Sequence, residues 1–238
     1  MQRKHQYHAV LIADSRARGF SEYDQGKLYT YTTHYVIKPG ATIQRLKDDA
    51  LALIQSIPST DTTLIVVIAA GINNLTNKID KDHGYEISPS TATASQITTA
   101  LLDLKWEIKN ARPSALVTFA TIPPVNFLLQ LKYWQSRDCI QTPIHPESDR
   151  LEFQKSHETI INDINSRICE INYNEQSGIH CQTTSWHSAV LRRQRGKNRL
   201  IVSALSDGIH GTEEVKRKWH QGFHQAVQKD IALLQAKQ

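Results

Sequence analysis

Residues 9–20 read Ala-Val-Leu-Ile-Ala-Asp-Ser-Arg-Ala-Arg-Gly-Phe, an apolar run that stops at Asp14-Ser15 and reaches a glycine four residues later. The apolar part is typical of a short strand that is buried on both faces. Ligands of α/β sheets bind at the carboxyl ends of the strands, so a hydroxyl at Ser15 would face that crevice. Asp-Ser after a strand also suits an ordinary helix cap. The rest of the chain has to decide between these two interpretations.

Strands and helices alternate along the chain. Apolar or β-branched runs predict strands, and apolar residues at three- and four-residue spacing predict helices. We expect strands at residues 9–13, 29–37, 64–70, 115–122 and 179–186, and helices at residues 41–57, 90–110, 147–172 and 212–234. Residues 125–145 look irregular, with Tyr133 and Trp134 as edges of a candidate pocket. The alternation predicts one α/β domain over residues 1–238, in which helices cover both faces of a five-stranded parallel sheet.

Composition limits the class of protein. Of the 238 residues, 39% are hydrophobic and 21% are charged, which is typical of a soluble globular chain rather than a disordered one. The longest apolar run, residues 64–71, is too short to cross a bilayer, and the basic N-terminus lacks the apolar stretch of a secretion signal. The three cysteines, Cys139, Cys169 and Cys181, form no CxxC motif and cannot all pair. We therefore expect an intracellular, reducing location, although a fragment of a longer polypeptide would show the same features.

Basic residues gather in one segment of the chain. The formal net charge is +5, and the densest run of cations lies between residues 192 and 199. It comprises Arg192, Arg193, Arg195, Lys197 and Arg199. Such a run is usually a solvated loop, but it can also bind nucleic acid or an anionic membrane surface through counterion release. Both interpretations stay open from the sequence.

Chemically useful residues follow the predicted strands. Ser15 follows the first strand, Gly40 with a closely approachable backbone N–H follows the second, and Asn73 with its amide donor follows the third. Near the C-terminus, Asp207 precedes His210 by three residues. On a turn, this carboxylate could orient the imidazole and leave its other nitrogen for the serine. The set supplies a nucleophile, a base, an orienting acid and oxyanion donors, which predicts serine-dependent ester hydrolysis.

Four short blocks occur in a characteristic order: Asp14-Ser15, Gly40, Gly71-Ile72-Asn73-Asn74 and Asp207-Gly208-Ile209-His210. In this order the chain resembles the SGNH (GDSL-type) hydrolase superfamily over residues 8–235. The resemblance implies a flavodoxin-like three-layer α/β/α sandwich and cleavage of a small-molecule or lipid ester without cofactor or metal. It implies Ser15, Asp207 and His210 as the catalytic triad, and Ser15, Gly40 and Asn73 as the oxyanion hole. The blocks around Gly40 and Asn73 are similar, more faintly, to esterase-like domains of animal mobile elements.

Two positions depart from the family pattern. Ala13 stands where the family usually has glycine, and Asn74 stands where it usually has aspartate. Neither residue belongs to the triad, but an amide at position 74 could hold the loop around Asn73 less firmly, and small displacements are costly for catalysis. The alternative is therefore a catalytically degenerate SGNH-like module that binds nucleic acid or anionic surfaces through residues 192–199.

Two further pairs of residues have competing interpretations. His220 and His224 lie four residues apart on the predicted last helix, which suits a metal ion, but the sequence around them offers no third ligand. We therefore expect them to be packing or solvent-side histidines. Arg16 and Arg18 could hold an acidic substrate group near Ser15, although exposed arginines need no such role.

Overall fold

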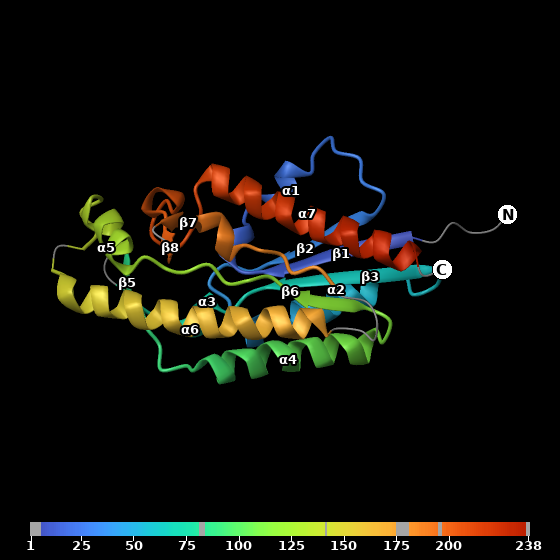
Figure 1. The fold of residues 1–238 in the computed structure, drawn as a ribbon, viewed down its shortest axis with the longest axis horizontal. Coiled ribbons are helices and arrows are strands. Elements are labelled where there is room, and N and C mark those ends of the chain that lie inside the picture. The colour runs from blue at the N-terminus through green and yellow to red at the C-terminus, as the bar shows by residue number, and fades with distance from the viewer. Residues whose placement is uncertain (1–5, 81–83, 141, 175–180, 195–196, 237–238) are drawn as a thin grey trace.

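A parallel sheet lies between two layers of helices (Figure 1). The computed structural model describes residues 6–80, 84–140, 142–174, 181–194 and 197–236. The helices are α1 Phe20–Tyr23, α2 Ile43–Ser56, α3 Ile72–Leu75, α4 Ala94–Ala111, α5 Phe127–Gln135, α6 Glu147–Tyr173 and α7 Glu213–Gln235, and 3₁₀ turns occupy Ser15–Ala17, His187–Val190 and Val202–Ala204. The strands are β1 Gln6–Ala13, β2 Thr32–Ile37, β3 Thr62–Ala69, β4 Thr76–Asp80, β5 Tyr85–Pro89, β6 Leu116–Phe119, β7 Leu191–Gln194 and β8 Lys197–Leu200.

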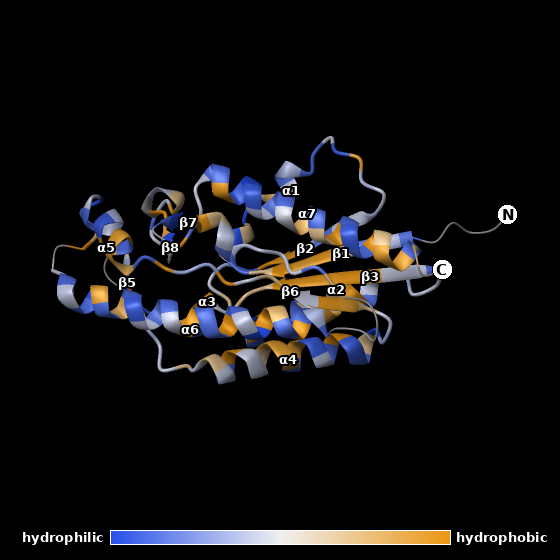
Figure 2. Ribbon diagram, viewed as in Figure 1, coloured by the Kyte–Doolittle hydropathy of each residue, from blue (hydrophilic) through white to orange (hydrophobic). Residues whose placement is uncertain are grey.

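Four of these strands form the central sheet, in the order β2-β1-β3-β6 and all parallel. Successive side chains of a strand point to opposite faces, so β1 contributes to two cores. Val10 and Ile12 pack with α2, α4 and α6, whereas Leu11 packs with Phe20 and α7. Figure 2 shows the hydrophobic strands between helices whose outer faces are hydrophilic. The expected α/β class and three-layer arrangement are confirmed.

The register of the sheet aligns the ends of its strands. Ala13, the last residue of β1, pairs with Ile37 at the end of β2 and with Ala69 at the end of β3. The segments that follow these three strands therefore leave the sheet side by side. They begin at Asp14, Lys38 and Ala70, and they carry the candidate residues Ser15, Gly40 and Asn73.

The sheet has four strands, so the predicted fifth strand at residues 179–186 is wrong. Ile179 lies outside the described residues, and residues 181–185 run past the end of β6 without forming a strand. One backbone hydrogen bond, from Thr121 N to Thr184 O, joins the two segments. Other polar groups of this stretch bond to helix side chains, since Gln182 N donates to Asp230 of α7 and Thr183 Oγ1 accepts from Asn172 of α6. These side chains take the place of a neighbouring strand.

The structure contains two hairpins and a helix that were not predicted from the sequence. β4 and β5 pair as an antiparallel hairpin in a segment that is mostly polar. Helix α5 lies inside residues 125–145, where we expected irregular structure. β7 and β8 form a second hairpin that carries the basic segment. No helix among the described residues combines the length and the apolar composition needed to cross a membrane.

Candidate active site

Ser15 stands at the first position after the end of β1 that is open to solvent. Asp14 caps the 3₁₀ turn Ser15–Ala17, because its side chain accepts a hydrogen bond from Arg16 N at 3.0 Å. Asp14 and Arg16 are both buried, whereas Ser15 is half-buried. The local sequence therefore anchors the turn on either side of Ser15 and leaves its hydroxyl facing a cleft.

His210 and Asp207 lie beside Ser15, on the turn that precedes α7. The Oγ of Ser15 is 2.8 Å from Nε2 of His210, and Nδ1 of His210 is 2.7 Å from Oδ2 of Asp207. The second carboxylate oxygen of Asp207 accepts hydrogen bonds from the backbone N–H groups of His210 and Ile209. With the proton on Nδ1 directed to the carboxylate, Nε2 is left to accept the serine proton. Residues that are 195 positions apart in the chain thus form one continuous hydrogen-bonded relay.

The carboxyl group of Asp207 is held in its charged form. Burial alone would raise its pKa, but the hydrogen bond and charge of His210, together with the two backbone N–H donors, lower the pKa below its ordinary value. Asp207 is therefore a carboxylate at neutral pH. A charged acceptor at Nδ1 fixes the tautomer of His210 and stabilises the ring when it takes up a proton.

Gly208 allows the turn that carries this pair to lie against α5. Its φ of +85° is in the left-handed region that favours glycine, and a Cβ there would lie 2.6 Å from the backbone N of Gln130. The carbonyl of Gly208 accepts a hydrogen bond of 2.7 Å from Asn126 N, at the start of α5. The turn is closed by a bridge between Leu205 and Gly211. The position of His210 thus depends on a helix that sequence reasoning missed.

Gly40 and Asn73 line the same cleft as Ser15. One hydrogen of the Asn73 amide is used in a 3.0 Å bond from Nδ2 to the carbonyl of Ala41, next to Gly40. Asn74 joins the same two loops, since its Oδ1 accepts from Ile43 N at 2.9 Å. The asparagine at position 74 therefore fastens the loop of Asn73 to the start of α2 and does not leave it loose.

A cleft of about 570 Å³ opens in front of Ser15. Tyr85 of β5 and Trp134 of α5 form part of its wall, with ring centroids 5.3 Å apart, and Tyr133 lies beside them. The expected pocket edge at Tyr133 and Trp134 is thus present. Two cations, Arg18 and Lys78, also line the cleft. The β4–β5 hairpin supplies cleft residues that no sequence motif indicated.

Arg16 and Arg18 differ in their surroundings. Arg18 lines the cleft, but Arg16 is only 2% exposed and is absent from the cleft lining. Burial lowers the pKa of Arg16, and the charge of the neighbouring Asp14 carboxylate opposes that effect. Only Arg18 of this pair is placed to contact a substrate at Ser15.

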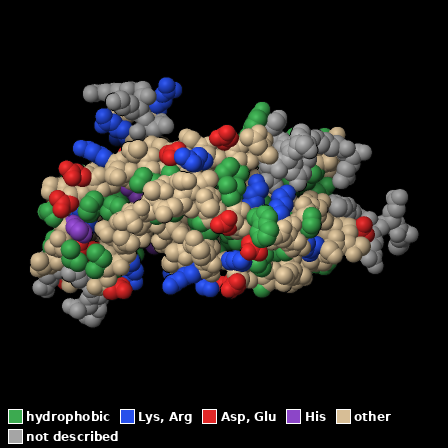
Figure 3. All heavy atoms as spheres, turned by 90° about the horizontal axis from the view of Figure 1, so that it is seen from below, with side chains coloured by type: hydrophobic (Ala, Val, Ile, Leu, Met, Phe, Trp, Pro, Cys, Tyr) green, Lys and Arg blue, Asp and Glu red, His purple; other side chains and the backbone are tan. Residues whose placement is uncertain are grey.

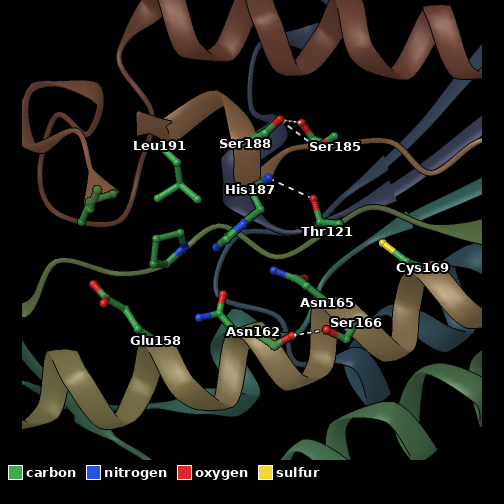
Figure 4. A pocket seen from close by; sticks show the side chains of 12 residues that line it. Thr121, Glu158, Asn162, Asn165, Ser166, Cys169, Ser185, His187, Ser188 and Leu191 are labelled. Carbon is green, nitrogen blue, oxygen red and sulfur yellow. Dashed lines mark hydrogen bonds between the residues drawn. The ribbon is translucent and has the colours of Figure 1, made fainter. Parts of the chain in front are cut away.

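A larger cavity of about 990 Å³ lies between α6 and the 3₁₀ turn at His187 (Figure 4). Its wall includes Ser185, Ser188, Cys169 and His187. Among the described residues, no hydrogen bond joins the His187 ring to either serine or to the cysteine. Burial, followed by the charge of Arg16, lowers the pKa of His187. This cavity lacks the relay seen at Ser15.

The basic segment forms the β7–β8 hairpin. Arg192, Arg193 and Arg199 are exposed, Arg195 lies outside the described residues, and the side chain of Lys197 is likewise not described. Leu191 and Leu200, at the base of the hairpin, line the larger cavity and not the cleft at Ser15. The basic segment is therefore a surface separate from the relay.

Comparison of structures finds proteins of known structure with the same fold, whereas comparison of sequences finds no match. No protein-family model and no curated protein sequence matches the chain. A GDSL-like lipase from Bacteroides thetaiotaomicron is 16% identical, with a TM-score of 0.55 over 93% of this chain and 88% of that one. A carbohydrate esterase of family 3 from Talaromyces cellulolyticus is 11% identical, with a TM-score of 0.53 over 95% and 99% of the two chains. The catalytic domain of a peptidoglycan O-acetyltransferase from Streptococcus pneumoniae is 14% identical, with a TM-score of 0.51 over 95% and 96%.

These likenesses extend over nearly the whole chain at low sequence identity, so they establish the fold. The chain has the fold of the SGNH (GDSL-type) hydrolase superfamily, as the order of its four sequence blocks implied. None of the three proteins named above is described as part of a mobile element, so that fainter resemblance gains no support from them.

Proposed function

We propose that this chain is an SGNH-type acyl hydrolase or acyltransferase that works through Ser15, His210 and Asp207. The observation that carries the proposal is the pair of short hydrogen bonds, 2.8 Å and 2.7 Å, that connects the three side chains in the order needed for proton transfer. Either Asp-x-x-His or Asp-Ser alone would be an ordinary turn. Their meeting in one cleft, on a fold shared with lipases and esterases, favours catalysis over a degenerate binding module.

The chemistry follows from the positions of the protons. The Oγ of Ser15 attacks the carbonyl carbon of an ester while Nε2 of His210 takes the hydroxyl proton. The tetrahedral intermediate collapses, His210 returns the proton to the departing alkoxide, and the acyl group stays on Ser15. Water, or a second alcohol, then gives a proton to His210 and attacks the acyl carbon. The second intermediate collapses, its bond to Ser15 Oγ breaks, and Ser15 takes the proton back from His210. Hydrolysis and acyl transfer differ only in this second nucleophile.

The developing oxyanion requires donors that are already in place. The backbone N–H groups of Ser15 and Gly40 and the second amide hydrogen of Asn73 are the candidate donors. The bond from Asn73 Nδ2 to Ala41 O and the bond from Ile43 N to Asn74 Oδ1 fix the loops that carry Gly40 and Asn73. Donors fixed in this way do not reorganise during the reaction, which is the main source of their catalytic effect.

The cleft favours an ester with a flat or ring-shaped portion. The Tyr85 ring contacts the Trp134 ring, and the ammonium of Lys78 is 4.8 Å from the Tyr85 ring centroid. Burial, followed by the charge of Asp207, raises the pKa of Tyr85 to about 12, so its hydroxyl remains a neutral hydrogen-bond donor. Aromatic walls with such donors suit aryl or sugar rings. An aryl acetate is therefore a suitable first substrate.

The test compares three forms of the protein on an aryl acetate. Ser15→Ala should lower turnover by about 10⁴–10⁶-fold, because the nucleophile is lost. Ser188→Ala, which changes a serine beside the larger cavity, should leave turnover unchanged. Equal rates for Ser15→Ala and wild type would refute the proposal. Adding an alcohol and measuring the ratio of transferred to hydrolysed acetyl groups then separates a transferase from a hydrolase.

A second candidate function is nucleic-acid binding by the β7–β8 hairpin. Arg192 and Arg199 lie directly opposite each other in the antiparallel pair, which places like charges side by side unless an anion lies between them. Over most of the face shown in Figure 3, basic and acidic side chains are interspersed. Replacing Arg192, Arg193 and Arg199 with glutamine should remove salt-dependent binding of a short RNA or DNA. Equal binding by this variant, or binding only to anionic vesicles, would contradict it.

A further inference from the structure

The loop after α1 and the middle of α7 bring together three side chains that ligate metals. The Oδ1 atom of Asp24 is 2.8 Å from Nε2 of His220 and 3.0 Å from Nε2 of His224. The two Nε2 atoms are themselves 3.0 Å apart. Among the described residues, these three form the one such group of potential ligands. The sequence did not show this group, because no motif links Asp24 to His220, which lies 196 positions later.

Hydrogen bonding alone does not satisfy this triangle of atoms. A single proton on one Nε2 can serve two of the three contacts, but the other nitrogen then turns a lone pair toward the carboxylate oxygen. If both Nε2 atoms carry protons, each can donate to Asp24, but the two N–H groups then face each other at 3.0 Å. While Asp24 is a carboxylate, every arrangement of protons on the two rings leaves one repulsive contact in the triangle, next to two buried histidines. A shared cation would make all three contacts favourable.

We propose that Asp24, His220 and His224 bind a divalent transition-metal ion, and that Zn²⁺ fits the site best. Tetrahedral zinc with bonds of about 2.0–2.1 Å places its ligand atoms about 3.3 Å apart. The observed separations of 2.8–3.0 Å need to widen by only a few tenths of an ångström. Two imidazoles and one carboxylate are ligands that Zn²⁺ accepts, and water supplies the fourth.

Neighbouring hydroxyl groups hold the ligands in place. The hydroxyl of Tyr31 is 2.7 Å from Nδ1 of His224, so this ring can donate Nδ1–H to the tyrosine oxygen and present a bare Nε2. The hydroxyls of Tyr35 and Tyr29 donate to the two oxygens of Asp24. Such outer contacts fix the tautomer and the orientation of ligands in metal sites.

Burial and packing leave the ligands little freedom. His220 and His224 are 2% and 5% exposed. The ring of His224 stacks on Tyr29 at a centroid distance of 4.2 Å, and the ring of His220 meets the face of Phe20 edge-on. The side chain of Asp24 is 17% exposed and leaves an entry for the ion and its water. Rings that are fixed in this way lose little entropy on binding a metal.

The position of the three ligands indicates what a bound metal ion would do in the protein. Asp24 follows α1, nine residues after Ser15, and His220 lies on α7, ten residues after His210. A metal at this point would tie together the two segments that lead directly from Ser15 and from His210. The ion would thereby stabilise the packing of α1 on α7 without taking part in the ester chemistry.

The test uses the complete protein after removal of metal with a chelator. Co²⁺ is titrated into the protein, because its visible absorption reports nitrogen and oxygen ligands in tetrahedral geometry, and Zn²⁺ is then used to displace it. We expect one Co²⁺ per chain and a higher melting temperature with Zn²⁺. Asp24→Asn and His224→Gln should lose the absorption and the thermal shift. His145→Gln removes a histidine outside the site and should behave as wild type.

Tyr31→Phe keeps all three ligands and removes only the partner of His224 Nδ1. It should weaken Co²⁺ binding by about 10–100-fold. The proposal is overturned if wild type does not bind Co²⁺, or if both ligand variants bind it as wild type does, since the ion would then lie elsewhere. If circular dichroism shows that a ligand variant is unfolded, Tyr31→Phe decides: weaker binding supports the site, and unchanged binding contradicts it.

Discussion

Gly208→Ala should damage both the stability and the activity of the protein, because this glycine lies between Asp207 and His210 and against α5. The left-handed φ of +85° costs an alanine about 1–2 kcal/mol. A methyl group 2.6 Å from Gln130 N also has to push the turn away from α5, and overpacking of this kind adds about 1–3 kcal/mol. The free energy of unfolding should therefore fall by about 2–5 kcal/mol.

Displacement of the turn moves His210 away from Ser15. A shift of about 1 Å at a reacting group lowers kcat/KM by about 10²-fold. The assays are urea unfolding and hydrolysis of an aryl acetate.

Gly26→Ala is the matched control for this substitution. Gly26 also has a left-handed φ, +74°, but a Cβ there would meet no atom within 4 Å. It should lose only the backbone contribution to stability, about 1–2 kcal/mol, and keep its kcat/KM. If Gly208→Ala retains the turnover of wild type, or if Gly26→Ala is equally inactive, then the contact of the turn with α5 does not position His210.

Three other predictions concern the site and its support. Asn73→Ala should lower kcat by about 10²–10³-fold with little change in KM, measured on an aryl acetate, because an oxyanion donor is lost. Glu86→Ala should lower the free energy of unfolding in urea by about 3–5 kcal/mol, because it leaves Arg150, with a fully buried side chain, without its carboxylate. The pKa of Asp207 is lower in the folded protein than its ordinary value of 3.8, so its charge stabilises the fold above pH 3.8. This contribution is lost as the pH falls through the pKa of the folded protein. Asp207→Asn should therefore reduce the loss of unfolding free energy at acid pH. An unchanged kcat in Asn73→Ala, an unchanged urea midpoint in Glu86→Ala, or an unchanged loss of stability at acid pH in Asp207→Asn would refute the respective prediction.

The central layers of the fold could be predicted from the sequence because their residues are buried on both sides. Residues 9–13 of β1 and 64–69 of β3 are all apolar, which is typical of strands that are covered on both faces. Long amphipathic helices such as α4 and α7 show their periodicity equally directly. Residues 179–186 carried a weaker signal, and Asp230 and Asn172 bind parts of that stretch in place of a neighbouring strand.

The sequence predicted which residues make up the candidate active site, but not which elements hold them in place. Ser15, Gly40 and Asn73 follow predicted strands, and parallel strands end at the same edge, so the sequence predicted that these three would meet. His210 follows no strand, and its place beside Ser15 was implied by the order of the four blocks. The contact of Gly208 with α5 and the cleft wall from Tyr85 depend on segments that the sequence left irregular or polar. Tertiary contacts decided the structure of those segments.

Two further features of the structure could not be predicted, because no motif in the sequence indicates them. His220 and His224 look like a ligand pair on a helix, but their partner Asp24 follows a short helix near the other end of the chain. Arg16 looks like a surface residue from its charge, yet it is buried beside Asp14. Burial and tertiary contacts of this kind depend on the whole fold, and no local sequence pattern indicates them.

Reaction with a fluorophosphonate tests the catalytic role of Ser15 most directly, since this reagent modifies a serine only when a base activates its hydroxyl. Mass spectrometry of the wild-type protein should find the adduct on Ser15, and His210→Gln should react far more slowly. Absence of an adduct, an adduct on another residue such as Ser188, or an undiminished rate in His210→Gln would contradict the proposed relay.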